Sequence, residues 1–289
     1  MSWRTVVISN SAKLDYQMGY MIVRQNETTK IHLSEIALLL IESTAVSLTV
    51  ALLAELTKQK IKVIFCDYKR NPSSELIPCY GSHDTSAKIR AQIKWNIETK
   101  KIIWREIVLE KIKNQKKMLQ YAGKLEEAKL LENYMEEIEP GDATNREGHA
   151  AKVYFNALFG KEFSRTSDIP FNAALNYGYG IILSTVNREI VSSGYITQLG
   201  IFHDNMFNAF NLGSDLMEPF RILIDKEVYE LQPEKFDHEE KMEILNVLNH
   251  EVYIDGKKQY ILNAIKIYCR SVFDALNEMD PSVIKFFQW

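Results

Sequence analysis

The stretch Ile36-Ala-Leu-Leu-Leu-Ile-Glu-Ser-Thr-Ala-Val-Ser-Leu-Thr-Val-Ala-Leu-Leu53 is the longest apolar segment of the sequence. Polar residues interrupt it, among them Glu42, Ser43, Thr44 and Ser47. The segment therefore falls short of the roughly 20 apolar residues that a membrane-spanning helix needs. We predict instead that it is buried core, with a strand at residues 37–41 and a helix at residues 47–58, where apolar residues recur at helical spacing. No membrane association is expected.

Short runs rich in β-branched residues and bounded by turn residues lie on both sides of this segment. The runs cover residues 4–8, 14–17, 20–24, 30–33, 37–41 and 63–66. They predict a small, β-rich, β-sandwich-like N-terminal domain at residues 1–80. A cluster of Pro, Ser and Gly residues between Pro72 and Ser82, including Gly81, marks the expected domain boundary. Such a domain is a reasonable dimerisation surface.

The remaining residues, 81–289, show apolar positions at a period of 3.6 over long windows. Ile93, Ile97, Ile103, Ile107 and Ile112 form one such series, with charged residues between them. Because 289 residues exceed what one core usually serves, two domains are expected. The predicted fold class is α+β, with the small β-rich domain followed by a larger all-α catalytic domain.

The composition, 46% hydrophobic and 25% charged, is that of a globular protein. A net charge of −3 provides no overall attraction for nucleic acid, so DNA binding would need a local basic patch. Lysines and arginines between Lys88 and Lys124, interleaved with Trp95 and Trp104, are one candidate; a solvated helix face with compensating glutamates is the alternative. Three scattered cysteines and an opening without an apolar signal segment indicate a reducing, cytoplasmic compartment.

The segment Thr144-Asn-Arg-Glu147 opens a predicted helix that continues to Phe159 and ends at Gly160. It fits a capping box, in which Thr144 caps the helix and Glu147 reaches back to a backbone N–H. On this segment alone, the structural interpretation is preferred to a catalytic one.

Asn172 and Asn176 stand four residues apart beside small residues, so one helix face is polar and allows close approach of a neighbour. A buried amide pair needs hydrogen-bond partners. The pair is typical either of a closely packed helix crossing or of residues that orient a nearby site.

Two further segments carry groups that could take part in chemistry. His203 follows apolar residues in Gly200-Ile-Phe-His203, where a single histidine is usually structural. Asp215, Glu218 and Arg221 are spaced by three, so a helix places them on about the same side. Pro219 indicates a helix start or kink close to Glu218. Acidic residues in a first helical turn are also favoured by the helix dipole alone.

The order of these four motifs resembles that of the CRISPR-associated integrase family, the endonuclease subunit of the spacer-acquisition complex. The opening Trp3-Arg-Thr-Val-Val-Ile8 is similar to the branch of that family found beside the type II-A effector nuclease. By this resemblance, Glu147, His203 and Glu218 are the metal ligands and catalytic residues, and Asp215 supports them. Many relatives have Asp where this chain has Glu218, which bears on metal preference.

Two carboxylates and one imidazole suit Mg²⁺ or Mn²⁺. The resemblance implies that the chain joins the 3′-OH ends of captured DNA fragments to phosphodiesters of a CRISPR repeat by transesterification. Plausible phosphate-binding residues are Arg146, Arg221, Lys152 and Arg165. The alternatives are a stand-alone metal-dependent nuclease for branched DNA, with water as nucleophile, and a helical scaffold or DNA-binding adaptor.

The family's assembly sets the expected partners. They are double-stranded DNA, a second copy in a homodimer, and the small ferredoxin-like subunit of the acquisition complex. The type II effector nuclease and a ring-forming accessory protein are further candidates. Joining two ends to opposite strands needs two active sites, which one chain with one site cannot supply.

Overall fold

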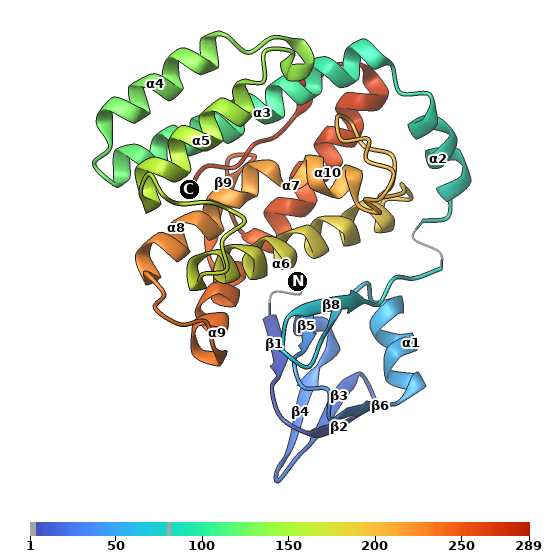
Figure 1. Cartoon of the computed structure of the whole chain (residues 1–289). Coiled ribbons are helices and arrows are strands. Elements are labelled where there is room, and N and C mark those ends of the chain that lie inside the picture. Colours follow the sequence, from blue (N-terminus) through green and yellow to red (C-terminus); the bar gives the residue numbers. More distant parts are fainter. Residues whose placement is uncertain (1–3, 80–81) are drawn as a thin grey trace.

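The computed structural model describes residues 4–79 and 82–289, so Trp3 of the opening motif and Gly81 of the boundary cluster lie outside the described residues. Figure 1 shows a smaller part built mainly from strands and a larger part built mainly from helices. This mixed α+β arrangement, with N-terminal strands and a helical C-terminal region, is the predicted one. None of the described helices is long and apolar enough to cross a membrane.

The N-terminal part contains two four-stranded sheets. Its elements are β1 (Arg4–Ile8), β2 (Ala12–Gln17), β3 (Tyr20–Arg24), β4 (Thr28–His32), β5 (Ile36–Ile41), β6 (Val46–Leu48), α1 (Val50–Lys58), β7 (Lys62–Cys66) and β8 (Pro72–Glu75). One sheet has the order β1-β5-β7-β8, with β1, β5 and β7 parallel, and the other has the order β4-β3-β2-β6. The predicted runs are strands, whereas β6 and β8 were not predicted and the sandwich-like packing is not confirmed.

Strand β5 explains the continuous apolar run at residues 36–41, because both of its faces are buried. Leu39 and Ile41 face one cluster, which includes residues of the second sheet and of α1. Leu38 and Leu40 face the other way, into the large core of the helical part. One sheet is therefore shared by two cores, and this fixes the β-rich part against the helices.

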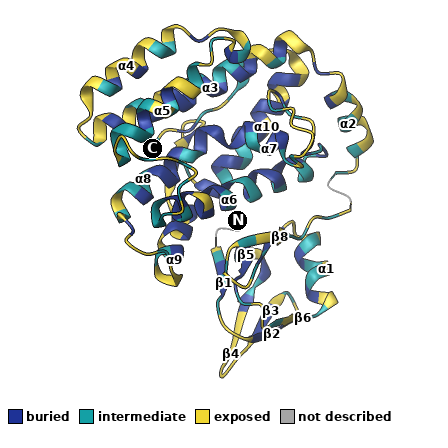
Figure 2. Ribbon diagram, viewed as in Figure 1, coloured by how far each residue is buried: buried dark blue, intermediate teal, exposed yellow. Residues whose placement is uncertain are grey.

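The C-terminal part of the structure is built mainly from helices. Its helices are α2 (Thr85–Ile93), α3 (Ile97–Tyr121), α4 (Leu125–Glu136), α5 (Arg146–Phe159), α6 (Pro170–Ser192), α7 (Asn211–Met217), α8 (Arg221–Leu231), α9 (His238–Asn246) and α10 (Ile261–Glu278). Short 3-10 turns include η2 (Pro140–Asp142) and η3 (Glu218–Phe220). Figure 2 shows buried residues concentrated on α6, α7 and α10, while the outer helix α4 is largely exposed.

The prediction that residues 81–289 are all-α is wrong at one place. Strands β9 (Glu251–Ile254) and β10 (Lys257–Tyr260) form an antiparallel hairpin. Its turn is Asp255-Gly256, and both residues have positive φ, at 53° and 70°. Asp-Gly between alternating apolar residues is a strong hairpin signal, with Val252 and Ile254 buried here. The surrounding helical periodicity obscured it.

Helix α6 joins the two parts of the molecule. The Ser184 hydroxyl donates to Glu75 of β8 at 2.6 Å, and on its other side α6 packs against α8 and α9. Gly178 is the point of closest approach, because a Cβ there would lie 2.9 Å from Ile224 Cδ1 and 3.0 Å from Ile244 Cγ2. The close packing of α6, which carries Asn172 and Asn176, therefore requires glycine at position 178.

We expect Gly178→Ala to lower the free energy of unfolding by about 1 to 2 kcal/mol, since the overpacking cost exceeds the gain in helix propensity. Gly180→Ala is the matched control, because a Cβ at Gly180 would have no neighbour within 4 Å. It should stabilise the chain by up to about 1 kcal/mol. Urea denaturation of both variants measures the difference; equal stabilities would contradict the packing argument.

Candidate active site

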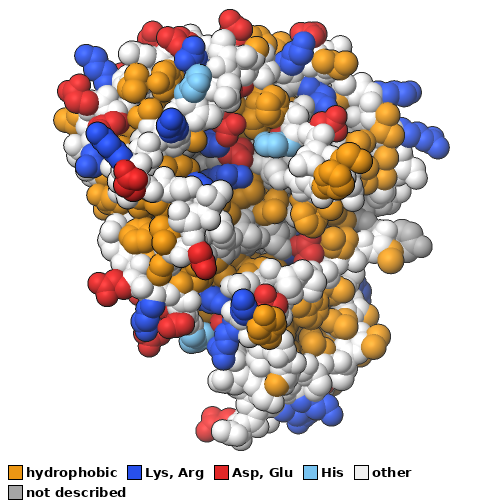
Figure 3. Space-filling model, viewed as in Figure 1, with side chains coloured by type: hydrophobic (Ala, Val, Ile, Leu, Met, Phe, Trp, Pro, Cys, Tyr) orange, Lys and Arg blue, Asp and Glu red, His pale blue; other side chains and the backbone are white. Residues whose placement is uncertain are grey.

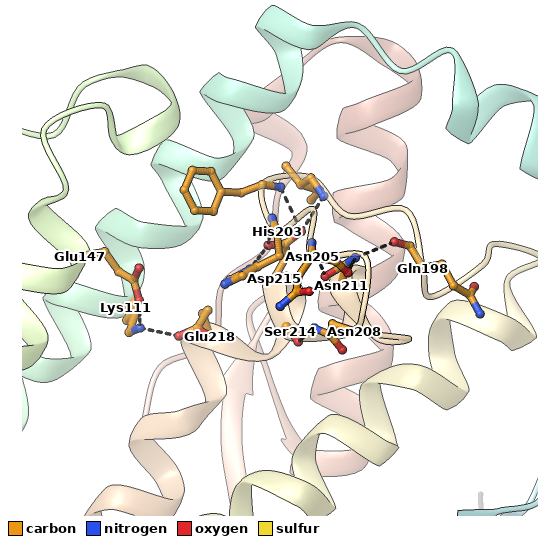
Figure 4. A network of polar contacts seen from close by, with 12 residues as sticks. Lys111, Glu147, Gln198, His203, Asn205, Asn208, Asn211, Ser214, Asp215 and Glu218 are labelled. Atoms are coloured by element: carbon orange, nitrogen blue, oxygen red, sulfur yellow. Dashed lines mark hydrogen bonds and ion pairs between the residues drawn. The ribbon is translucent and has the colours of Figure 1, made fainter. Parts of the chain in front are cut away.

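Three segments far apart in the sequence meet at the ammonium group of Lys111. Lys111 lies on α3, Glu147 in the first turn of α5, and Glu218 at the junction of α7 and α8. The Lys111 ammonium donates to Oε1 of Glu147 and lies 2.5 Å from Oε2 of Glu218 (Figure 4). Two of the three predicted ligands therefore share one cation in this structure.

The capping box predicted at Thr144 is absent, because the helix begins differently. Asn145 is the N-cap and has a left-handed backbone, at φ 52°, while the Thr144 hydroxyl donates to the Glu137 carbonyl at 3.2 Å. The first-turn N–H groups of Arg146 and Glu147 donate instead to the Asp142 carboxylate, at 2.8 and 3.0 Å. Asp142 thus performs the capping role, and the Glu147 side chain is left to contact Lys111.

Glu218 lies at the predicted kink, where η3 separates α7 from α8 and contains Pro219. Its side chain is 2% exposed and pairs with Arg221 one turn later, at 2.8 Å. Burial by itself raises the pKa of Glu218, but Arg221 and Lys111 outweigh it, so the pKa is lowered and the group is ionised. Arg221 therefore holds Glu218 in this structure, and its predicted role in phosphate binding stays a prediction.

His203 lies in the loop before α7 and is oriented by Asp215. The fully buried Asp215 carboxylate accepts the backbone N–H groups of Ile201, Phe202 and His203 at 2.5, 3.0 and 3.1 Å. It also bonds Nδ1 of His203 at 2.6 Å, and this hydrogen bond raises the pKa of the imidazole. Since Nδ1 is occupied, Nε2 is the nitrogen that can reach another group.

The charges of Glu218 and Glu147 also act on His203, which indicates that the imidazole and both carboxylates share one neighbourhood. Within residues 4–79 and 82–289, however, the structure has no group of three acidic, His or Cys side chains arranged as a metal cage. The ammonium of Lys111 lies between the carboxylates instead. The assignment of Glu147, His203 and Glu218 as metal ligands stays a prediction.

Asn172 and Asn176 contact Arg165, not the carboxylates. The Arg165 guanidinium donates to Oδ1 of Asn172 at 2.5 Å and of Asn176 at 2.7 Å. Asn172 also donates to the carbonyls of Ser164 and Ser167. The amide pair thus orients a half-buried cation whose guanidinium lies 5.3 Å from the Tyr179 ring centre.

The other predicted DNA-binding residues are placed differently. Arg146 pairs with Glu137 at 3.1 Å, and Lys152 is exposed on α5. In the basic run on α2 and α3, Trp95 and Trp104 are buried, and several cations pair with glutamates, as Lys113 does with Glu110 at 3.0 Å. The compensated helix face is therefore the better description of that run.

Two groups in the site were not predicted. Lys111 belongs to the basic run, but it lies four residues after Ile107 and seven after Trp104, on the apolar face of α3. That spacing is a usable signal, since a lysine on a buried face needs an acidic partner. Asp225, on α8, is 2% exposed and accepts the hydroxyls of Tyr154, at 3.0 Å, and Tyr179. Its sequence context carries no comparable signal.

Burial raises the pKa of Asp225 from 3.8 to about 6, because the tyrosine hydrogen bonds offset only part of the desolvation cost. A carboxyl with a raised folded pKa contributes stability that is present below the unfolded pKa and lost as the pH rises through about 6. We expect Asp225→Asn to remove this loss. The free energy of unfolding of the variant, relative to that of the parent chain, should therefore grow by up to about 3 kcal/mol between pH 4 and pH 7.

Urea denaturation across this pH range measures the difference. Asp274→Asn, which changes an exposed carboxylate on α10, is the control and should show a flat difference. A flat difference for Asp225→Asn as well would show that Asp225 has no raised pKa.

Figure 3 shows acidic, basic and histidine side chains together near the middle of one face of the helical part, beside a group of apolar side chains. The fold and this clustering define a class: two-part α+β proteins whose helical part carries an acidic cluster with a histidine. The chain belongs to the CRISPR associated protein Cas1 family, whose profile matches residues 5–258.

Individual proteins agree with this assignment. The chain is 32% identical over 271 residues to the CRISPR-associated endonuclease Cas1 of Neisseria meningitidis serogroup C (strain 8013), covering 92% of this chain and 89% of the relative. The fold is similar to that of a casposase bound to integration product, with a TM-score of 0.76 at 17% identity, over 96% of this chain and 91% of that one.

The fold is also similar to that of a chain of a Cas6-RT-Cas1–Cas2 complex, with a TM-score of 0.74 at 18% identity. That match covers 97% of this chain and 36% of the longer one. Together with the Neisseria relative, the family match confirms the predicted CRISPR-associated integrase family.

Proposed function

We propose that this chain is a metal-dependent DNA integrase that joins the 3′-OH ends of captured DNA fragments to phosphodiesters of a CRISPR repeat by transesterification. Membership of the Cas1 family supports integration and nuclease chemistry in general. The observation that carries the finer proposal is the pair of carboxylates, Glu147 and Glu218, gathered around one cation beside His203.

The residues present fit a divalent ion. Oε2 of Glu218 is buried and is paired with the Lys111 ammonium at 2.5 Å, so the site already holds one cation between its carboxylates. The hydrogen bond from His203 Nδ1 to Asp215 is the usual second contact of a metal-binding histidine. We infer that Glu147, Glu218 and Nε2 of His203 hold Mg²⁺ or Mn²⁺. Such an ion supplies Lewis-acid activation of the phosphodiester and lowers the pKa of the attacking hydroxyl.

The other groups of the site bind and orient. Asp215 fixes the tautomer and position of His203, and Arg221 keeps Glu218 ionised. Arg165, oriented by Asn172 and Asn176, is the best placed of the predicted cations to meet a phosphate, because its guanidinium is bonded to neutral amides and not to a carboxylate.

The assembly we propose contains double-stranded DNA, two copies of this chain and a small ferredoxin-like subunit. The similarity in fold to a chain of the Cas6-RT-Cas1–Cas2 complex, which includes a Cas2 component, supports a CRISPR-associated partner. Two ends joined to opposite strands require two such sites, which a symmetric homodimer would supply. The type II effector nuclease and a ring-forming accessory protein remain further proposed partners.

The second candidate is a nuclease that uses water on branched DNA, a function that the word endonuclease in the relative's name favours. A labelled 3′-OH duplex and a supercoiled repeat plasmid separate the two, with Mg²⁺ or Mn²⁺ and with or without the small subunit. Covalent transfer of label supports integration, and nicking without transfer favours the nuclease. A duplex with a 3′-dideoxy end is the control, and it should block covalent transfer but leave nicking unchanged. No reaction under any of these conditions would contradict both.

A further inference from the structure

The loop that carries His203 also presents two of the most exposed apolar side chains of the described structure. Met206 is 87% exposed and Phe207 is 88% exposed. Most apolar side chains of this size in the helical part are buried, so the pair is unusual for its position. The loop between His203 and α7 therefore offers a large apolar surface beside the candidate active site.

Hydrogen bonds hold this loop in one shape (Figure 4). The amide of Asn211 donates to the carbonyls of Gln198 and Asn205, both at 3.0 Å. Oδ1 of Asn205 accepts the N–H of Phe207 at 2.9 Å, and Oδ1 of Asn208 accepts the N–H of Phe210 at 2.9 Å. Because the backbone on both sides of the exposed pair is fixed, inserting these side chains into a partner would cost little ordering entropy.

The near end of the loop is fixed as well. The ring of Phe202 stacks on the buried Trp104, at 4.6 Å between centres and 2° between planes. Met206 and Phe207 lie three and four positions after His203, so their Cα atoms lie within about 11 and 14 Å of the His203 Cα. At about 3.4 Å per base pair, a phosphate at His203 lies within roughly four base steps of this pair.

We propose that Met206 and Phe207 form a wedge that inserts between base pairs of the bound DNA, within about four steps of the scissile phosphodiester. This inference rests on the proposed function. Apolar Phe and Met side chains unstack and kink DNA in this way in other proteins. A kinked step would present the phosphodiester to the site and make joining sensitive to the flexibility of the target.

DNA is the occupant that the geometry favours. The exposed pair and His203 belong to one short loop, so a duplex whose phosphate reaches His203 comes close to Met206 and Phe207. Every base offers a stacking face, so the contact needs no particular sequence. A second copy of the chain or a protein subunit on this surface would instead compete with DNA for the space beside His203.

A branched duplex that mimics the joined product, with 2-aminopurine at successive steps beside the junction, tests the wedge. The chain carrying Glu147→Gln should bind this branched duplex without cutting it, and fluorescence anisotropy measures the binding. We expect 2-aminopurine fluorescence to rise severalfold at one step. Phe207→Ala should abolish the rise at saturating protein, and Met206→Ala should reduce it. Phe207→Leu should keep most of it. Met18→Ala, which changes a 93% exposed residue of the β2–β3 turn, is the control.

In the chain that keeps Glu147, Phe207→Ala should slow the joining reaction about tenfold or more. Binding and joining without any Phe207-dependent fluorescence change would overturn the wedge but leave the proposed function standing. Loss of dimer or subunit binding in Phe207→Ala, with fluorescence unchanged, would assign the surface to a protein. Absence of DNA binding by every variant would overturn the wedge and the proposed function together.

Discussion

The Glu147→Gln variant is expected to lose at least about 10³-fold in DNA joining or nicking, equivalent to about 4 kcal/mol of transition-state stabilisation. The substitution keeps the size of the side chain and removes the negative charge. In the proposed site that charge is one of two carboxylates available to a divalent ion. The reaction should therefore fail at the chemical step, and a rate measured at saturating DNA is the appropriate readout.

Stability should change little in the same variant, because the buried Lys111 ammonium keeps the Glu218 carboxylate as its partner. Glu147 is 25% exposed, and Asp142, not Glu147, satisfies the first N–H groups of α5. Glu137→Gln is a matched control, because Glu137 is a carboxylate paired with Arg146 at the same end of α5. It should retain full activity. Full activity of Glu147→Gln would show that the Glu147 carboxylate is not a required metal ligand, and inactivity with an unchanged melting temperature would exclude the scaffold or adaptor hypothesis.

Most of the architecture followed from periodicity. The runs at residues 4–8 and 20–24 are strands β1 and β3 with the predicted ends, and Gly160 ends α5 at the predicted place. The elements that were missed are short. Strand β8 lies in the Pro and Ser cluster taken as a boundary, and Pro72 is tolerated there because β8 is an edge strand. The boundary itself, near residue 80, stays a prediction.

The candidate site was harder to predict, because it depends on contacts between distant segments. The motifs identified Glu147, His203, Asp215 and Glu218, and the structure groups them around α3, α5 and the α7–α8 kink. Local sequence suggested a capping box that the left-handed Asn145 and the carboxylate of Asp142 replace. The role of Lys111 required knowing which face of α3 is buried, and which carboxylates face it from two other helices.

The position of Lys111 has a consequence for metal binding. The Lys111 ammonium lies between two carboxylates, and the Lys111 side chain is 9% exposed. The charges of Glu218 and Glu147 raise the pKa of Lys111 in spite of burial. A divalent ion held by the same carboxylates must compete with this ammonium or displace it. Lys111 therefore acts as an internal counter-ion that holds the two carboxylates close together.

We expect Lys111→Met to destabilise the metal-free chain by about 3 to 5 kcal/mol, because the buried Glu218 keeps Arg221 but loses the Lys111 charge, and the two carboxylates then repel each other. The melting temperature should fall by about 10 °C or more. Mn²⁺ or Mg²⁺ should restore much of this loss, since an ion at about 100 times its Kd stabilises the folded state by about 2.7 kcal/mol. In the parent chain the same ion should raise the melting temperature less, because it must first displace the ammonium.

Lys101→Met is the matched control, because Lys101 is on the same helix, 47% exposed, and pairs with Glu98, which is 72% exposed. It should melt close to the parent chain with no added dependence on metal, as expected for an exposed ion pair. The double variant Lys111→Met/Glu147→Gln sharpens the test, since it should regain stability without metal and lose most of the response to Mn²⁺. If Mn²⁺ raises the melting temperature of the single and double variants equally, the ion binds elsewhere and Glu147 is not its ligand.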